Sequence, residues 1–262
     1  MLIRIGSSDN SRIRLVRKLQ TRKGRSTERR FVAEGINLVS EALRRDLDID
    51  FVMVSDAYDG GQMLEDMKAS DRLTVCEVPS AMFDRLTDAE NGVGIIAVIH
   101  TLQCDASVID DLPEDANVLV LDRIQDPGNL GTMIRTAVAA GYGMIIAVRG
   151  TADIWSAKVL RSTAGMIFDI PFVYVSGAEE LCTILRKAGK RITVTDPAGG
   201  RPYFEEDLKH GIALVIGNEG NGISDEVMSI ADLRVTLPMH GEVESLNAAV
   251  SAAILMYESV RS

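Results

Sequence analysis

Short apolar runs alternate with amphipathic stretches throughout the second half of the chain. The runs that predict strands lie at 118–122, 144–148, 171–175, 191–195, 212–216 and 233–237. Apolar residues at helical spacing predict helices at 129–140, 156–164, 178–188, 224–230 and 245–260. Near-continuous apolar strands such as residues 118–121 are typical of a parallel sheet that is covered on both faces. The pattern therefore predicts an α/β fold with a parallel sheet for residues 117–262.

The first hundred residues show the same alternation on a smaller scale. Strands are predicted at 49–54, 73–78 and 93–99, and helices at 11–20, from Phe31 onward, at 59–68 and from Pro79. In the helix predicted from Phe31, the residues Leu38, Ala42 and Leu43 share one face. This spacing predicts a smaller α/β domain at 1–103. Residues 104–116 are acidic, contain a proline and lack periodicity, so we interpret them as a linker.

Charge is distributed unevenly along the chain. The net charge of the 262 residues is −10, but residues 1–30 hold ten Arg or Lys and only two acids. Such an asymmetry predicts a basic arm, residues 1–30, that contacts the phosphates of a nucleic acid. A solvated basic tail without a partner is the alternative, and charge alone does not separate the two.

Composition limits the remaining function classes. The longest apolar runs are strand-sized, well short of the ~20 residues that a membrane helix needs. The charged N-terminus lacks the apolar segment of a signal peptide. Three widely spaced cysteines without a CxxC pair predict neither a disulfide framework nor a zinc site, and they fit a reducing, cytoplasmic setting. The three histidines do not cluster, so no metal is expected.

Three segments pass from an apolar strand through Gly or Pro into a polar helix start. They are residues 121–137, 214–224 and 237–250, and such turns are where α/β proteins place ligand sites. In the first segment Asn129 is a candidate helix cap. Arg135 lies further along the same helix and leans toward its positive N-terminal end, which favours an anion nearby. A surface arginine without a ligand is the alternative.

The other two segments carry different polar residues. Residues 217–222 have the glycine order G-x-x-G-x-G, which matches neither the dinucleotide fingerprint nor the phosphate loop. Glycines here still allow a ligand to approach the main chain, although a tight turn without a ligand fits equally. In the third segment Ser245 occupies the expected N-cap position of the helix predicted at 245–260, and Asn247 lies in its first turn. Capping alone is the alternative role for Ser245.

In this order and spacing, the three segments resemble motifs 1, 2 and 3 of the SpoU (TrmH) family of RNA 2′-O-methyltransferases. The resemblance covers residues 117–262, and residues 158–165 match a segment that this family carries between motifs 1 and 2. The basic arm, residues 30–35 and residues 94–98 resemble the family's substrate-binding domain. One departure is Asn91-Gly92-Val93, where family members often have a Pro-Gln pair before the glycine.

The resemblance implies a trefoil-knotted SPOUT methyltransferase domain at 117–262 and an RNA substrate-binding domain at 1–103. It also implies S-adenosylmethionine as the methyl donor, an RNA substrate, and a homodimer that uses the last helix. Ribosomal RNA fits the extra N-terminal domain better than tRNA, by family analogy. The implied cofactor contacts are Thr195, Gly217, Leu237, Met239 and Leu246. The implied catalytic positions are Asn129, Arg135, Glu219, Ser245 and Asn247.

Two rival functions are a non-catalytic RNA-binding or ribosome-assembly protein on the same fold, and a Rossmann dehydrogenase. The intact motif positions favour the enzyme over the first, and the glycine order disfavours the second. A guanidinium has a pKa of about 12 and therefore stays protonated at neutral pH. We expect Arg135 to bind phosphate and stabilise alkoxide charge rather than act as a base. The ribose proton would then pass to phosphate, water or Glu219.

Overall fold

The computed structural model describes residues 1–87, 94–102, 104–241 and 245–261, and its chain divides into two compact units. The first unit consists of Met1–Leu102 together with Trp155–Gly165, and the second of Gln103–Ile154 together with Met166–Ser262. The stretch around residues 156–164, which the sequence groups with the second half of the chain, thus packs within the first unit. Asn91-Gly92-Val93 lies outside the described residues.

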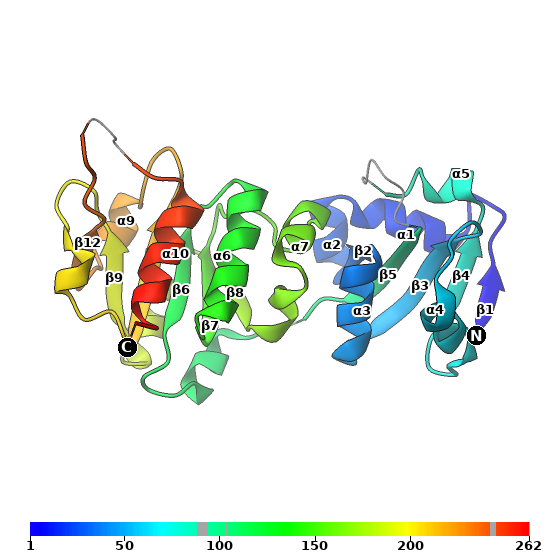
Figure 1. The fold of residues 1–262 in the computed structure, drawn as a ribbon, viewed down its shortest axis with the longest axis horizontal. Helices are drawn as coiled ribbons and strands as arrows, with labels where there is room; N and C mark the ends of the chain where they lie inside the picture. The colour runs from blue at the N-terminus through cyan, green and yellow to red at the C-terminus, as the bar shows by residue number, and fades with distance from the viewer. Residues whose placement is uncertain (88–93, 103, 242–244, 262) are drawn as a thin grey trace. The chain divides into compact units, whose positions relative to one another are not determined.

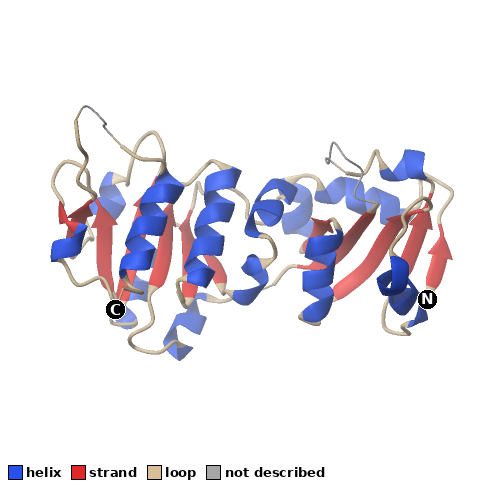
Figure 2. Cartoon of the chain, in the orientation of Figure 1, coloured by secondary structure: helices blue, strands red, loops and turns tan. Residues whose placement is uncertain are grey.

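A five-stranded sheet forms the centre of the first unit (Figures 1 and 2). Its strands stand in the order β1-β4-β3-β5-β2, and β5 runs antiparallel to both of its neighbours. The strands are β1 (Leu2–Arg4), β2 (Arg30–Glu34), β3 (Ile49–Ser55), β4 (Val75–Val78) and β5 (Ile95–His100). The helices are α1 (Ser11–Leu19), α2 (Arg22–Glu28), α3 (Ile36–Arg44), α4 (Gly61–Ala69), α5 (Ser80–Phe83) and α7 (Ala157–Thr163).

Helices cover both faces of this sheet. On one face, Ile13 and Val16 of α1 share a buried core with Phe51 and Met53 of β3. Successive residues of a strand point to opposite faces, so Val52 turns to the other side of the sheet. That side is covered by α3 and α4, which Figure 1 shows in front of the strands. The basic helices α1 and α2 and the pair α3–α4 therefore belong to different surfaces of the unit.

The predicted basic arm is a folded part of the first unit. Residues 1–30 form β1, α1 and α2, and Ile5, Ile13 and Leu19 are buried in the core. The helix predicted from Phe31 is wrong at its start, because Phe31 lies in β2 and pairs with Ile99 of β5. The helix begins only after Gly35, whose φ of 91° interrupts the chain between strand and helix.

Within the first unit, the segment that contains α7 contacts β2 through an aromatic pair and an ion pair. The rings of Phe31 and Trp155 are stacked with centroids 4.5 Å apart. The guanidinium of Arg161 donates to the carboxylate of Glu34 at 2.6 Å, and the Glu34 side chain is buried. A hydrogen-bonded partner is what a buried carboxylate requires. These partners are far apart in sequence, which is why periodicity alone did not reveal the grouping.

A seven-stranded sheet forms the second unit, and all of its paired strands run parallel. Their order is β10-β12-β9-β11-β6-β7-β8. The strands are β6 (Val118–Asp122), β7 (Met144–Val148), β8 (Phe172–Val175), β9 (Arg191–Thr195), β10 (Arg201–Pro202), β11 (Ile212–Gly217) and β12 (Leu233–Thr236). The predicted parallel α/β fold is confirmed, with β10 as an additional short strand. The trefoil knot stays a prediction.

Helices of the second unit begin at residues that differ from the predicted caps. They are α6 (Pro127–Ala139), α8 (Ala178–Lys187), α9 (Asp225–Met228) and α10 (Ala248–Glu258), with the 3₁₀ turns η1 (Ala106–Asp111), η2 (Met166–Asp169) and η3 (Tyr203–Glu205). Asp126, not Asn129, caps α6, because its carboxylate accepts from the Asn129 backbone N–H with Pro127 at the first position. Asn247, not Ser245, caps α10 through the backbone N–H groups of Ala249 and Val250.

The predicted linker is attached to the second unit by a buried lysine. The Lys190 amine, in a residue only 3% exposed, donates to the carbonyl oxygens of Pro113, Glu114 and Ala116 at 3.1, 2.9 and 2.8 Å. Burial lowers the pKa of Lys190. The three acceptors follow η1 in the predicted linker. Lys190 therefore satisfies carbonyl groups there that do not belong to a helix or strand.

We expect Lys190→Met to lower the free energy of unfolding by about 2 kcal/mol, because three buried carbonyl groups lose a charged donor. Urea unfolding followed by circular dichroism measures the change. Lys187→Met is the matched control, since Lys187 is mostly exposed and pairs with Asp110 at the surface. Equal losses in the two variants would contradict the bracing role of Lys190.

Across the described ranges, no helix is long and apolar enough to cross a membrane.

Candidate active site

A cavity of about 760 Å³ opens where β9, β11 and β12 of the second unit end. The carboxyl ends of neighbouring parallel strands meet at one edge of a sheet, which is the usual place for a ligand in this class of fold. All five residues predicted to contact a cofactor line this cavity: Thr195, Gly217, Leu237, Met239 and Leu246. The five residues therefore lie around one cavity, and their contact with a cofactor stays a prediction.

The wall of the cavity beside β11 is a tight turn formed by residues 218–224, here called the glycine loop. Asn218 and Gly222 exchange two backbone hydrogen bonds of 2.9 Å each. Gly222 has a φ of 67°, and a side chain on Gly217 would collide with the backbone of Gly222 and Ile223. The turn thus requires glycine at these two positions.

Both ends of the glycine loop are attached to the end of β6. At the far end, Asp122 is fully buried and accepts from the backbone N–H and the hydroxyl of Ser224 at 2.6 and 2.7 Å. At the near end, the side-chain amide of Asn218 donates to the carbonyl oxygen of Arg123 at 2.9 Å. Sequence reasoning missed Asp122, although an acidic residue that directly follows four buried apolar residues was a usable signal.

Three of the predicted catalytic residues form one hydrogen-bonded group, here called the polar cluster: Asn129, Glu219 and Asn247. The Asn129 amide donates to Glu219 at 3.1 Å, and the Asn247 amide donates to the Asn129 side-chain oxygen at 3.0 Å. The backbone N–H groups of Gln125 and Asp126 also donate to Glu219, both at 3.3 Å. The cluster joins the starts of α6 and α10 to the glycine loop, so the three motifs meet as the sequence indicated.

Two other predicted catalytic residues lie outside the polar cluster. Ser245 is exposed and lines the cavity. Arg135 is exposed on α6, does not line the cavity, and forms no hydrogen bond or ion pair with any residue that the structure describes. Arg135 lies on α6, which packs against α10. Its guanidinium is free to bind an anion there.

Hydrogen bonding keeps Glu219 ionised. Burial raises its pKa, but donation from Asn129 and from backbone N–H groups outweighs burial, so the pKa lies below the ordinary 4.5. A carboxyl group with a lowered pKa contributes its stabilisation above its unfolded-state pKa and loses it only as the pH falls through the folded-state value. The polar cluster is therefore charged at neutral pH, and Glu219 is a weak base.

We expect Glu219→Gln to lower the rate of catalysis by roughly tenfold, because an amide N–H₂ then faces the donors that Glu219 accepts. The pH–rate profile should keep its shape between about pH 5 and 8, since Glu219 does not titrate there. Single-turnover rates of both proteins across this range test the point. An acidic limb that is present in the unmodified protein and lost in the variant would show that Glu219 acts as the base.

Comparison with known proteins decides the family. The model of the SpoU rRNA Methylase family matches residues 116–257, more than half of the chain. The chain belongs to this family. A second family model, the MRM3-like substrate binding domain, matches residues 10–97. The SpoU match contains the cavity, the glycine loop and the polar cluster.

Relatives of this SpoU-family chain align over nearly their whole length. It is 35% identical over 253 residues to the 23S rRNA (guanosine(2553)-2′-O)-methyltransferase RlmP of Bacillus subtilis, covering 97% of each chain. The AdoMet-bound rRNA methyltransferase of Sinorhizobium meliloti superposes with a TM-score of 0.87 at 30% identity, over 98% of this chain and 97% of that one. The SpoU methyltransferase AviRb of Streptomyces viridochromogenes, in complex with AdoMet, gives a TM-score of 0.88 at 27% identity, over 96% and 97%.

The cavity of the SpoU-family chain fits an adenosyl cofactor. Its size is within the range of about 300–1,000 Å³ that small-molecule sites occupy. The aliphatic side chains of Ile216, Ile223 and Leu237 offer apolar walls to a purine ring, and the glycine loop exposes main-chain groups beside them. Asp196 and Glu219 add carboxylates that suit the positive ammonium and sulfonium groups of S-adenosylmethionine. Within the described ranges, no group of side chains is arranged to hold a metal ion.

Proposed function

We propose that this SpoU-family chain transfers a methyl group from S-adenosylmethionine to a ribose 2′-hydroxyl of ribosomal RNA. The observation that carries the proposal is the polar cluster, which the three family motifs form and whose Glu219 lines the cavity. Named relatives that align over most of this chain are 23S rRNA 2′-O-methyltransferases. The activity would take place in the cytoplasm, where ribosomal RNA is modified.

The positions of the site residues assign each of them a part in binding the cofactor or the ribose. S-adenosylmethionine supplies an electrophilic methyl group when bound. The glycine loop and the side chains of Leu237, Met239 and Leu246 would hold it in the cavity, with Thr195 at the end of β9 between them. Ser245, at the rim of the cavity, and the amides of Asn129 and Asn247 would orient the ribose. Because Glu219 is a weak base with both oxygens engaged, we assign the ribose proton to water or phosphate rather than to Glu219.

The first unit supplies the charge that RNA requires. The side chains of Arg14, Arg17, Arg22, Lys23 and Arg29 are exposed on α1, on α2 and directly after α2. Lysine and arginine neutralise backbone phosphates and contribute most of the affinity of sequence-independent binding. We therefore assign RNA binding to this basic surface, and the exposed cations on α1 and α2 support the assignment.

An exposed apolar stripe on α10 supports a homodimer. Leu246, Val250, Tyr257 and Val260 are 40%, 48%, 50% and 53% exposed, and the first lies just before α10 and the last just after it. Large apolar side chains gathered on one exposed surface are typical of a protein interface. Because α6 packs against α10, a dimer built on this stripe would bring Arg135 to the interface, where it could serve the cavity of the partner subunit.

We expect Val250→Asp to convert the dimer to a monomer, because an interface of this kind does not accommodate an unpaired buried charge. Analytical ultracentrifugation measures the mass. Ile36→Asp is the matched control, since Ile36 is 41% exposed in the first unit. A dimer that survives Val250→Asp, or a monomer in the unmodified protein, would contradict the proposed interface.

Transfer of a labelled methyl group tests the proposed function. Purified protein, labelled S-adenosylmethionine and unmodified RNA are incubated, with ribosomal RNA and tRNA in separate reactions. We expect label in ribosomal RNA and little in tRNA. Cofactor binding without transfer to any RNA would favour the rival function, a non-catalytic RNA-binding protein on the same fold. Absence of cofactor binding would overturn the methyltransferase assignment.

A further inference from the structure

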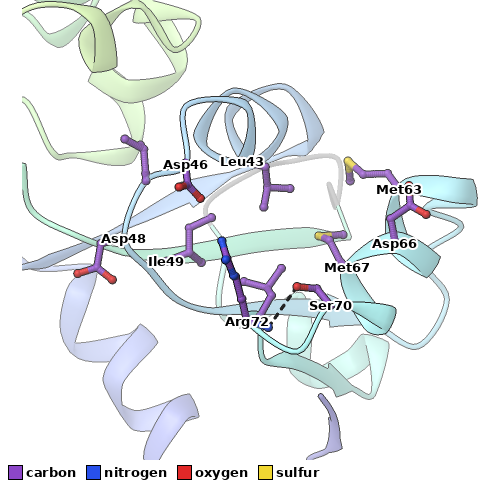
Figure 3. A pocket seen from close by; sticks show the side chains of 11 residues that line it. Leu43, Asp46, Asp48, Ile49, Met63, Asp66, Met67, Ser70 and Arg72 are labelled. Atoms are coloured by element: carbon purple, nitrogen blue, oxygen red, sulfur yellow. Dashed lines mark hydrogen bonds between the residues drawn. The ribbon is translucent and has the colours of Figure 1, made fainter.

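A second concave site lies in the first unit, away from its basic surface. It occupies about 590 Å³ between the end of α3, the start of β3, helix α4 and the turn that precedes β4 (Figure 3). We call it the α3–α4 groove. Its floor is formed by aliphatic and methionine side chains: Leu43, Leu47, Ile49, Met63, Met67 and Leu73. The methyltransferase assignment does not use any of these residues.

Acidic side chains form most of the rim of the α3–α4 groove. Asp46, Asp48 and Asp66 line it together with a single cation, Arg72. Asp46 and Asp48 form no ion pair with any residue in the described ranges, and both are exposed. Three carboxylates against one guanidinium leave the rim with an excess of negative charge. Figure 3 shows Asp46 and Asp48 on one side of the groove and Asp66 on the other, with apolar side chains and Arg72 between them.

The backbone of Asp46 is fixed by the end of α3. The backbone N–H of Asp46 donates to Leu43, and that of Leu47 donates to Ala42, which closes the helix with Asp46 in the left-handed region at a φ of 51°. Glycine is the usual residue at this position of a helix end. Here the chain presents a carboxylate instead, at the edge of the groove.

The negative rim argues against RNA as the occupant. Phosphate groups would be repelled by Asp46, Asp48 and Asp66, whereas the other face of the same sheet carries α1 and α2 with their exposed cations. The first unit therefore has two surfaces of opposite charge. A ligand of the α3–α4 groove must combine positive charge with apolar side chains.

We propose that the α3–α4 groove binds a basic segment of a protein partner, in which arginine or lysine alternates with aliphatic residues. The aliphatic side chains would fill the floor between Leu47, Met63 and Met67, and the cations would pair with the rim carboxylates. Complementary charge sets which partners approach and in which orientation, while the buried apolar side chains supply most of the affinity.

Methionine methyl signals provide a direct test that does not depend on methyl transfer. The full chain is labelled with ¹³C-methyl methionine and titrated with a short peptide that alternates arginine and leucine. We expect the signals of Met63 and Met67 to shift, while those of Met133 and Met144, which are buried in the second unit, stay in place. Peptides that alternate arginine with serine, or glutamate with leucine, should leave all four signals unchanged.

The variant D46N/D48N/D66N should weaken binding of the arginine–leucine peptide by about tenfold, because three exposed ion pairs together contribute roughly that much. D59N/D84N/D111N is the matched control, since it removes the same charge from exposed positions outside the groove and outside residues 1–30. Methyl transfer to free RNA should be equal in both variants. Equal peptide binding in the two variants would overturn the proposal. So would shifts of Met63 and Met67 caused by an RNA oligonucleotide, or by raising the protein concentration alone.

Discussion

Replacing Arg135 with alanine is expected to slow methyl transfer by about 10²–10³-fold, the usual cost of removing one donor that stabilises a developing oxyanion. Affinity for S-adenosylmethionine should not change, because Arg135 does not line the cavity. Single-turnover kinetics and calorimetric titration of the cofactor measure the two quantities. A slower rate with unchanged cofactor affinity would show that Arg135 acts in the reaction and not in folding.

The variant Arg135→Lys separates the effect of positive charge from that of the guanidinium geometry. It keeps the positive charge but loses the planar fork that binds a phosphate through two parallel hydrogen bonds. We expect it to retain a small fraction of the original rate. Nearly full activity in Arg135→Lys would contradict the proposed binding of phosphate by the guanidinium.

Mixing of subunits would locate the cavity that Arg135 serves. Gly217→Val should block the cofactor cavity, since a side chain there collides with the backbone of Gly222. If Arg135 acts on the cavity of the partner subunit, mixed dimers of Gly217→Val and Arg135→Ala regain activity, because one site then has both an open cavity and an intact arginine. No recovery in verified mixed dimers would place Arg135 and its cavity in the same subunit.

Replacing Asp122 with alanine is expected to lower the free energy of unfolding by about 3 kcal/mol, because two buried donors of Ser224 lose their acceptor. Cofactor affinity should fall as well, since Asp122 fixes the far end of the glycine loop although it does not line the cavity. Urea unfolding and calorimetric titration measure the two effects.

Two further variants define what Asp122 does. Asp122→Asn retains one acceptor oxygen and should recover part of both losses. Asp126→Ala is the matched control, because it removes only the cap of α6 and should cost about 1 kcal/mol. The bracing role of Asp122 would be contradicted if cofactor affinity stayed unchanged in Asp122→Ala.

The sequence predicted the second unit well because its strands are buried on both faces. Residues 118–122 and 144–148, for example, are wholly buried, so their near-continuous apolar sequence predicted the strands directly. β10 was missed because its two residues, Arg201 and Pro202, give no apolar pattern. The start of β2 was missed for a different reason. Phe31 pairs across the sheet with Ile99, a contact that local periodicity does not report.

The structure brings predicted site residues together where they lie at strand ends, whereas contacts between residues distant in sequence were missed. Thr195, Gly217 and Leu237 follow apolar runs, and the structure places them around one cavity. The caps of α6 and α10 were assigned to the wrong residues, because α6 begins earlier and α10 later than predicted, so that Asp126 and Asn247 stand at their N-caps. The support that Asp122 gives to Ser224 spans 102 residues, which no local pattern encodes.

Alkaline hydrolysis of the labelled product tests directly whether the methyl group is transferred to the ribose 2′-oxygen. Alkali cannot cut the RNA chain next to a 2′-O-methyl ribose, so methylation of ribose leaves labelled dinucleotides, whereas methylation of a base leaves labelled mononucleotides. We predict that the unmodified protein produces alkali-resistant labelled dinucleotides from ribosomal RNA and that Arg135→Ala does not. Label in mononucleotides alone, or dinucleotides that persist at full yield in Arg135→Ala, would contradict the account.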